Sequence, residues 1–193
     1  MKNKFLEIIL ATSLAVLLLP AFTVSVSAAV RGNGPATSSV GTVALTSAEQ
    51  DSLTLMREEE KLARDVYSHF YDLWQLPAFN YIAVSEQRHM DAIGNLMEKY
   101  GVSDPAVGND RGVFTNTELQ SLYDQLTGRG SESVEAALKV GVLIEETDIA
   151  DLQAGLEETT HADIARVYSN LLNGSYNHLA AFNNELTLLA SAA

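Results

Sequence analysis

The stretch Ser85-Glu86-Gln87-Arg88-His89-Met90 decides how the rest of the chain can fold. Its Glu86 and His89 are three residues apart, so on a helix their side chains lie on one face. The same face continues with apolar residues in both directions: Phe79, Ile82, Ile93, Leu96 and Tyr100. Burying a carboxylate without a partner costs several kcal/mol. We therefore expect this pair to have a partner, and a metal ion is one candidate.

Three further segments show the apolar periodicity of an amphipathic helix. The first begins at Thr46 or Ser47, because Ser47 and Gln50 form a capping-box pattern, and it ends before Pro77. Together with the segment around Glu86, the expected helices span about residues 46–74, 78–100, 131–155 and 159–189. Four such helices predict an all-α protein built as a four-helix bundle.

Residues 101–130 form a long connection between the second and third helices. Residues 101–112 are expected to form a loop. A short extra helix then begins near Thr115, and the Gly128-Arg129-Gly130 segment closes it. A connection of this length can carry the chain from one end of a bundle to the other.

Each of the other helices also places polar residues at the centre of its apolar face. These are Glu60 in the first helix, Glu145 and Asp148 in the third, and His178 in the fourth. With Glu86 and His89 they give four carboxylates and two imidazoles in the bundle interior. This donor set suits two divalent ions such as iron or manganese. Two such ions would neutralise four carboxylates, which makes their burial tolerable.

The candidate residues also have ordinary structural interpretations. Glu-x-x-His spacing occurs by chance in many helices, and a lone histidine such as His178 is more often a satisfied core residue. Asp148 could cap or interrupt a helix together with Thr147. Glu60 could belong to a solvated charge run paired with Lys61 and Arg64. We favour that solvated interpretation for the neighbouring Glu58, whereas Glu59 borders a second apolar stripe and is left undecided.

Other acidic and histidine residues fall outside the apolar faces. We expect Glu146, Asp151, Glu157 and Glu158 to lie on the surface, and His69 and His161 to be ordinary histidines.

Composition limits the classes of function. The chain has 193 residues, of which 47% are hydrophobic, so it can bury one sizeable core. Its net charge of −13 disfavours nucleic acids and anionic membrane surfaces as partners. There is no cysteine, so disulfides and thiolate metal sites are excluded, and any metal must take oxygen and nitrogen ligands.

The N-terminal residues resemble an export signal. Residues 1–28 combine Lys2 and Lys4, an apolar stretch, and a small-residue cleavage site, which predicts a secretory signal peptide. Cleavage after Ala28 fits this pattern, and cleavage after Ala29 fits almost as well. An uncleaved membrane anchor is the alternative. Residues 29–45 are expected to form a flexible linker and residues 46–190 the helical domain. The sequence thus predicts an exported protein without stable membrane insertion after cleavage.

Four segments carry a resemblance to a known family. They are MREEEKLARDVY (56–67), SEQRHMDAI (85–93), LIEETDIADL (143–152) and NHLAAF (177–182). Over about residues 47–187 the chain resembles a ferritin-like family filed as domain of unknown function 2202, and more distantly it is similar to rubrerythrins. The resemblance implies a ferritin-like four-helix bundle. By position it implies five metal ligands: Glu60, Glu86, His89, Glu145 and His178.

One position departs from the pattern of di-iron carboxylate bundles. The fourth helix should carry a glutamate three residues before His178, and that position is Ser175. Asp148 could supply the missing carboxylate from the third helix. Alternatively, the second ion is held weakly or only one ion binds.

Three functional hypotheses follow. The protein could be an exported oxidoreductase that reduces peroxide or oxygen or oxidises iron, with Tyr67 as a redox-active side chain near the metals. It could instead bind a metal ion without turnover. It could also be a structural bundle whose buried polar groups form a hydrogen-bonded network. The oligomeric state stays open, a homo-oligomer included.

Overall fold

The structure, a computed structural model, describes residues 44–192. Within that range it contains five α-helices and no strand, so the expectation of an all-α protein is confirmed. The helices are α2 (Ser47–Trp74), α3 (Pro77–Tyr100), α4 (Thr117–Gly130), α5 (Val134–Glu158) and α6 (Ala162–Ser191). The predicted signal peptide and most of the linker lie outside the described residues. None of the described helices is long and apolar enough to cross a membrane.

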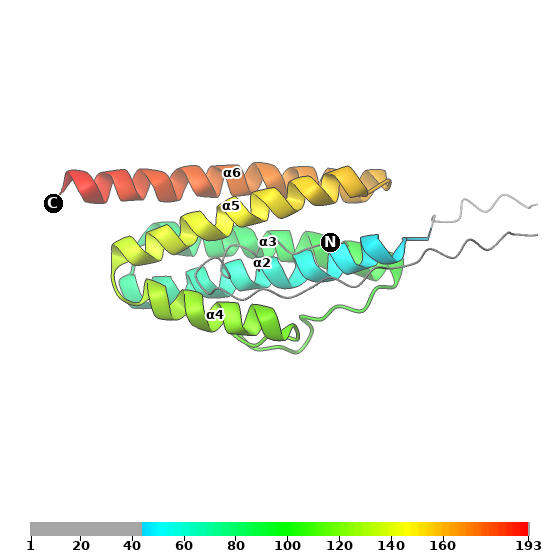
Figure 1. Cartoon of the computed structure of the whole chain (residues 1–193), viewed down its shortest axis with the longest axis horizontal. Coiled ribbons are helices and arrows are strands. Elements are labelled where there is room, and N and C mark those ends of the chain that lie inside the picture. The colour runs from blue at the N-terminus through cyan, green and yellow to red at the C-terminus, as the bar shows by residue number, and fades with distance from the viewer. Residues whose placement is uncertain (1–43, 193) are drawn as a thin grey trace, which may run out of the picture.

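The four long helices run side by side, and α4 lies along one side of them (Figure 1). Helix α2 packs against α3 and α5, and α6 packs against α5 and α3, which closes the bundle. The connection after α3 returns the chain along the bundle before α4 begins (Figure 1). The predicted long connection with a short extra helix is therefore present.

Local sequence explains where the helices begin and end. Thr46 is the N-cap of α2 and forms a reciprocal capping box with Glu49, so the predicted pair of Ser47 and Gln50 was wrong by one residue. Pro77 occupies the first turn of α3, where its missing N–H costs nothing. Gly101 ends α3 with a φ of 68°, a left-handed conformation that favours glycine.

The apolar core of the described chain forms two clusters along the bundle. One includes Tyr67, Phe70, Phe79 and Phe182. The other includes Leu53, Met56, Ile93, Leu152 and Tyr168. The candidate polar residues occupy the helix turns between these clusters. Apolar layers therefore lie on both sides of the polar residues along the bundle axis.

Two residues that we expected on the surface are buried. Glu58 accepts hydrogen bonds from the backbone N–H groups of Thr115 (2.6 Å) and Asn116 (3.1 Å), just before α4. Asp151 on α5 is also buried. The interpretation of Glu58 as a solvated charge was wrong because the connection before α4 folds back over α2 and covers it. Helical periodicity alone does not show where a loop will pack.

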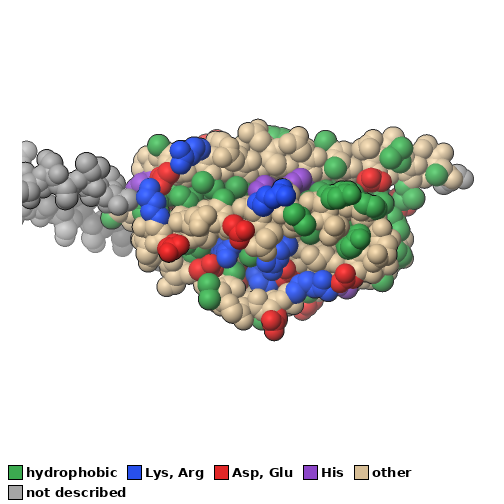
Figure 2. Space-filling model, turned by 180° about the vertical axis from the view of Figure 1, so that it is seen from behind, with side chains coloured by type: hydrophobic (Ala, Val, Ile, Leu, Met, Phe, Trp, Pro, Cys, Tyr) green, Lys and Arg blue, Asp and Glu red, His purple; other side chains and the backbone are tan. Residues whose placement is uncertain are grey.

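Several exposed hydrophobic side chains lie at one end of the molecule. Figure 2 shows them gathering toward the end where α6 projects beyond the other helices. Tyr81 and Val84 lie in the first turns of α3, and Leu188 lies in the last turns of α6, at this same end.

Candidate metal centre

Five of the six predicted ligands meet midway along the bundle. Glu60 comes from α2, Glu86 and His89 from α3, Glu145 from α5 and His178 from α6. The three glutamates are each 2% exposed, and the two histidines are 8–9% exposed. Figure 2 shows histidine side chains at the surface midway along the bundle. The imidazole side of the cluster is therefore its more accessible side.

Two groups of three ligand atoms form within this cluster. Glu60, Glu86 and His89 make one group, and Glu86, Glu145 and His178 make the other; in each, the ligand atoms lie within 4.8 Å of one another. Glu86 belongs to both groups. Its Oε2 lies 2.7 Å from His89 Nδ1, and its Oε1 lies 2.8 Å from His178 Nδ1. One carboxylate thus offers one oxygen to each group.

One buried oxygen of the cluster has no hydrogen-bond partner. Glu60 Oε1 is buried and makes no hydrogen bond, whereas Glu86 Oε1 and His178 Nδ1 contact each other as an ion pair at 2.8 Å. Leaving a buried polar atom without a hydrogen bond costs about 1–3 kcal/mol. The two imidazole rings stack with centroids 5.5 Å apart. Buried carboxylate and imidazole atoms that converge within a few ångströms are what a cation site requires, so these residues could hold metal ions.

Asp148, the sixth predicted residue, lies beside the two groups but belongs to neither. It lines a small cavity together with Glu59, Glu60, Glu86 and Glu145. Its Oδ2 accepts a 2.5 Å hydrogen bond from the hydroxyl of Ser175. Glu59, which sequence reasoning left undecided, is buried and lines the same cavity. In the sequence, the sign that Glu59 could be buried was its position at the border of a second apolar stripe.

Tyr67 is fully buried, and its hydroxyl donates a 2.7 Å hydrogen bond to Glu145 Oε1. This bond fixes the carboxylate of Glu145 so that its other oxygen, Oε2, faces His178 Nδ1 at 3.6 Å. Tyr67 therefore orients a candidate ligand, the role that outer partners play at metal sites.

The charges of the cluster shift the pKa values of its members in opposite directions. Burial raises the pKa of Glu60 to about 8, and burial with the charge of Glu86 raises that of Glu145 to about 8. For Glu86, burial is outweighed by the adjacent His178 and His89, which lower its pKa to about 2. Burial likewise opposes the charged histidines, but the carboxylates raise the pKa of His89 to about 11 and that of His178 to about 10.

Gly174 makes room for His89. A Cβ atom at position 174 would lie 2.6 Å from His89 Nε2, closer than real Cβ contacts. The ring of His89 therefore packs directly against the backbone of α6. This close approach requires glycine, and it lets His89 turn its Nδ1 toward Glu60 and Glu86.

We expect Gly174→Ala to displace the His89 ring and to lower the free energy of unfolding by about 1–3 kcal/mol, the usual cost of overpacking. Gly128→Ala is the matched control. Gly128 is helical, and nothing lies within 4 Å of its added Cβ. The control should therefore gain up to about 1 kcal/mol from helix propensity. Urea denaturation of both variants measures the difference, and equal stability of the two would contradict the contact.

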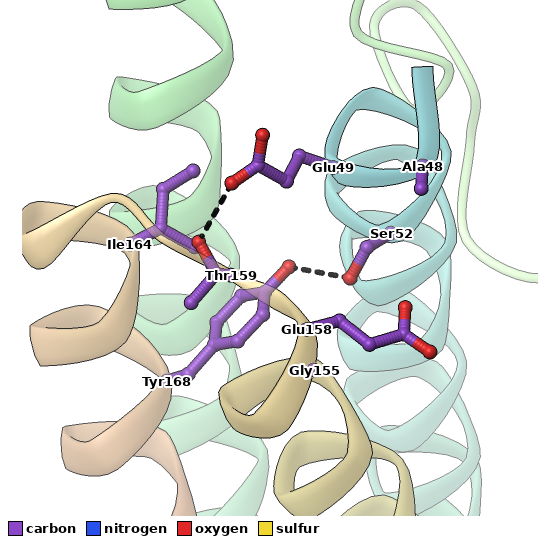
Figure 3. A pocket seen from close by; sticks show the side chains of 8 residues that line it. All are labelled: Ala48, Glu49, Ser52, Gly155, Glu158, Thr159, Ile164 and Tyr168. Carbon is purple, nitrogen blue, oxygen red and sulfur yellow. Dashed lines mark hydrogen bonds between the residues drawn. The ribbon is translucent and has the colours of Figure 1, made fainter. Parts of the chain in front are cut away.

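A second pocket lies at one end of the bundle and is a structural junction (Figure 3). There Thr159 donates a 3.1 Å hydrogen bond to Glu49, and the hydroxyls of Ser52 and Tyr168 lie 2.8 Å apart. The backbone N–H of Thr160 also donates to Glu49 Oε1, at 3.1 Å. Because Glu49 belongs to the capping box of α2, these bonds join the start of that helix to the turn between α5 and α6.

His161, predicted to be ordinary, lies at this junction and outside both ligand groups. Its Nδ1 lies 2.7 Å from Glu49 Oε1. Its ring meets that of Tyr100 edge-on, so α3 is joined to the same corner.

The fold and the cluster define an all-helical bundle with buried carboxylate and histidine groups that could hold a metal ion. Residues 49–190 match the family described as an uncharacterized protein domain, DUF2202, and the chain belongs to that family. Uncharacterized protein MJ0754 of Methanocaldococcus jannaschii is 50% identical over 134 residues, which are 69% of this chain and 72% of that protein. The family membership inferred from the four sequence segments is thus confirmed.

A solved structure has the same fold. The crystal structure of hypothetical protein MJ0754 from Methanococcus jannaschii DSM 2661 is similar with a TM-score of 0.76 and 46% sequence identity. The match covers 79% of this chain and 87% of that chain.

Proposed function

We propose that this protein is an exported, ferritin-like protein that binds two divalent metal ions, iron or manganese, in the centre of its helical bundle. The observation that carries the proposal is the position of Glu86, which faces both ligand groups with one oxygen each. Glu60 and His89 would complete the first site, and Glu145 and His178 the second. Only oxygen and nitrogen donors are present, which suits iron and manganese.

The protein's own residues prepare this centre before any ion binds. Tyr67 holds Glu145, and Gly174 admits His89. The two apolar clusters exclude water from both sides along the bundle axis, so electrostatic interactions at the centre are strong. Rigid, oriented ligands favour a defined metal coordination over nonspecific binding of cations to acidic side chains.

The proposed reaction is an oxidation–reduction with a small oxidant such as peroxide or oxygen, or the oxidation of iron itself. Bound iron or manganese would supply redox chemistry that the side chains lack. The chain would bind and orient the ions, and the slightly exposed imidazole side would admit the small substrate. The main alternative is a protein that holds the ions without turnover.

Elemental analysis of the purified protein after loading with iron(II) or manganese(II) tests the metal proposal. We expect close to two ions per chain. A protein that neither retains nor takes up metal would instead be a structural bundle, and a single ion would refute the two-ion centre. Consumption of peroxide or oxygen by the loaded protein then tests the reaction, and its absence would favour the alternative.

The mass of the protein recovered from outside the cytoplasm tests the export proposal. We expect the mass of a chain that begins at or just after residue 29. Retention of the complete N-terminus in the cytoplasm would refute export.

A further inference from the structure

Ser175 occupies the position on α6 that corresponds to Glu86 on α3. Glu86 precedes His89 by three residues, and Ser175 precedes His178 by three. Both positions are buried, and both histidines turn Nδ1 toward Glu86. The two helix pairs therefore present the cluster with similar halves, except that one half has a hydroxyl where the other has a carboxylate. A serine side chain is too short to take the place of a glutamate.

A carboxylate from another helix, that of Asp148 on α5, lies next to Ser175 instead. Asp148 follows Glu145 by three residues on α5, so both side chains lie on the same face of that helix. The hydroxyl of Ser175 donates to Asp148 Oδ2 at 2.5 Å. Asp148 lines the same cavity as Glu60, Glu86 and Glu145. The hydrogen bond from α6 therefore holds an α5 carboxylate at the edge of both ligand groups.

Charge balance favours a fourth carboxylate at the centre. The two ligand groups contain three carboxylates, Glu60, Glu86 and Glu145. Two divalent ions would exceed their negative charge by one unit, and an uncompensated buried charge is strongly destabilising. Asp148 is buried and lines the same cavity as these three glutamates, so it is placed to supply the missing unit.

We propose that Asp148 is the fourth carboxylate of the two-ion centre and that Ser175 is the residue that positions it. The pair replaces the glutamate that a second Glu-x-x-His motif would supply, moving the carboxylate from α6 to α5. This inference rests on the proposed metal binding. The competing explanation is that the two side chains only join α5 to α6 by a buried hydrogen bond.

Three variants separate these explanations. Asp148→Asn keeps the size of the side chain and an oxygen that accepts from Ser175, but it removes the charge. Ser175→Glu combined with Asp148→Ala moves the carboxylate back to α6. Glu146→Gln is the control, because Glu146 is an exposed neighbour on α5. The dissociation constants for manganese(II) and the electron paramagnetic resonance signal of a coupled manganese pair are measured for each variant and for the unaltered protein.

We expect Asp148→Asn to weaken binding of the second ion by more than about tenfold and to lose the coupled signal, while its metal-free form stays folded. The double variant should regain most of the affinity and the coupled signal, and Glu146→Gln should match the unaltered protein. A purely structural pair predicts lower stability of Asp148→Asn with unchanged metal affinity, which would overturn the proposal. If the double variant does not fold, the Asp148→Asn affinity decides alone.

The outcome also separates this inference from the proposed function. An unaltered protein that binds no metal overturns both. An unaltered protein that binds two ions, with Asp148→Asn binding them equally well, overturns only the role of Asp148 and Ser175.

Discussion

Glu86→Ala is expected to remove both metal ions at once, whereas His178→Ala should remove only one. The reason is the geometry of Glu86, whose two oxygens face different ligand groups at 2.7 Å from His89 Nδ1 and 2.8 Å from His178 Nδ1. Without this carboxylate each group keeps two ligands and the centre loses its link. Loss of a residue that only supports a metal ligand costs up to about 100-fold in metal affinity. Loss of Glu86, a direct ligand, should therefore weaken the binding of both ions by more than about 100-fold.

Metal content per chain after gel filtration measures this difference. Glu146→Ala is the control, because it removes an exposed carboxylate from the same bundle and should leave two ions. Glu58 is a poor control despite its place outside the centre. Its carboxylate binds the backbone N–H groups of Thr115 and Asn116, so its loss would also disturb the start of α4. One ion retained by Glu86→Ala would contradict a shared ligand.

The candidate centre could be located from the sequence because helical periodicity is a local property. Glu60 and Glu86 each interrupt an apolar stripe, and an interruption at the middle of a stripe must face the bundle interior. The long lengths of the helices and their caps fixed where those middles lie. The boundaries were less accurate: α5 begins at Val134 and α6 at Ala162, each about three residues later than expected.

What sequence periodicity could not give is contact between segments that are distant in the chain. Glu58 appeared in a charge run, but the connection that covers it lies 57 residues further on. Gly174 gave no signal at all, because its role depends on where the ring of His89 meets α6. Ser175 was recognised as a departure from a motif, whereas its bond to Asp148 required the packing of α5 on α6.

The metal-free protein is expected to lose stability as the pH rises from about 6.5 to about 8. Glu60 and Glu145 have pKa values raised from 4.5 to about 8, and His89 and His178 have values raised from 6.5 to about 11 and about 10. Between pH 6.5 and pH 8, these four groups keep protons in the folded state that they have already released in the unfolded state. The free energy of unfolding therefore falls with rising pH, by about 1.4 kcal/mol per pH unit for each such proton.

The histidines and the glutamates affect stability over different pH ranges. The histidines contribute stability that is complete below pH 6.5 and is lost as the pH rises through about 10 and 11. For the two glutamates, the cost of a buried carboxylate develops as the pH rises from 4.5 to about 8. Glu86, whose pKa is lowered to about 2, acts in the opposite direction, but only below pH 4.5. Glu60, Glu145, His89 and His178 therefore act together between pH 6.5 and 8.

Urea denaturation in the presence of a chelator measures this slope. Glu60→Gln combined with Glu145→Gln is the informative variant, since its neutral amides cannot titrate and its slope over this pH range should be smaller. Metal loading should act in the opposite sense, because the ions displace the same protons and therefore bind more tightly as the pH rises. Stability of the metal-free protein that stays constant or increases between pH 6.5 and 8 would show that these groups are not coupled as their burial and spacing require.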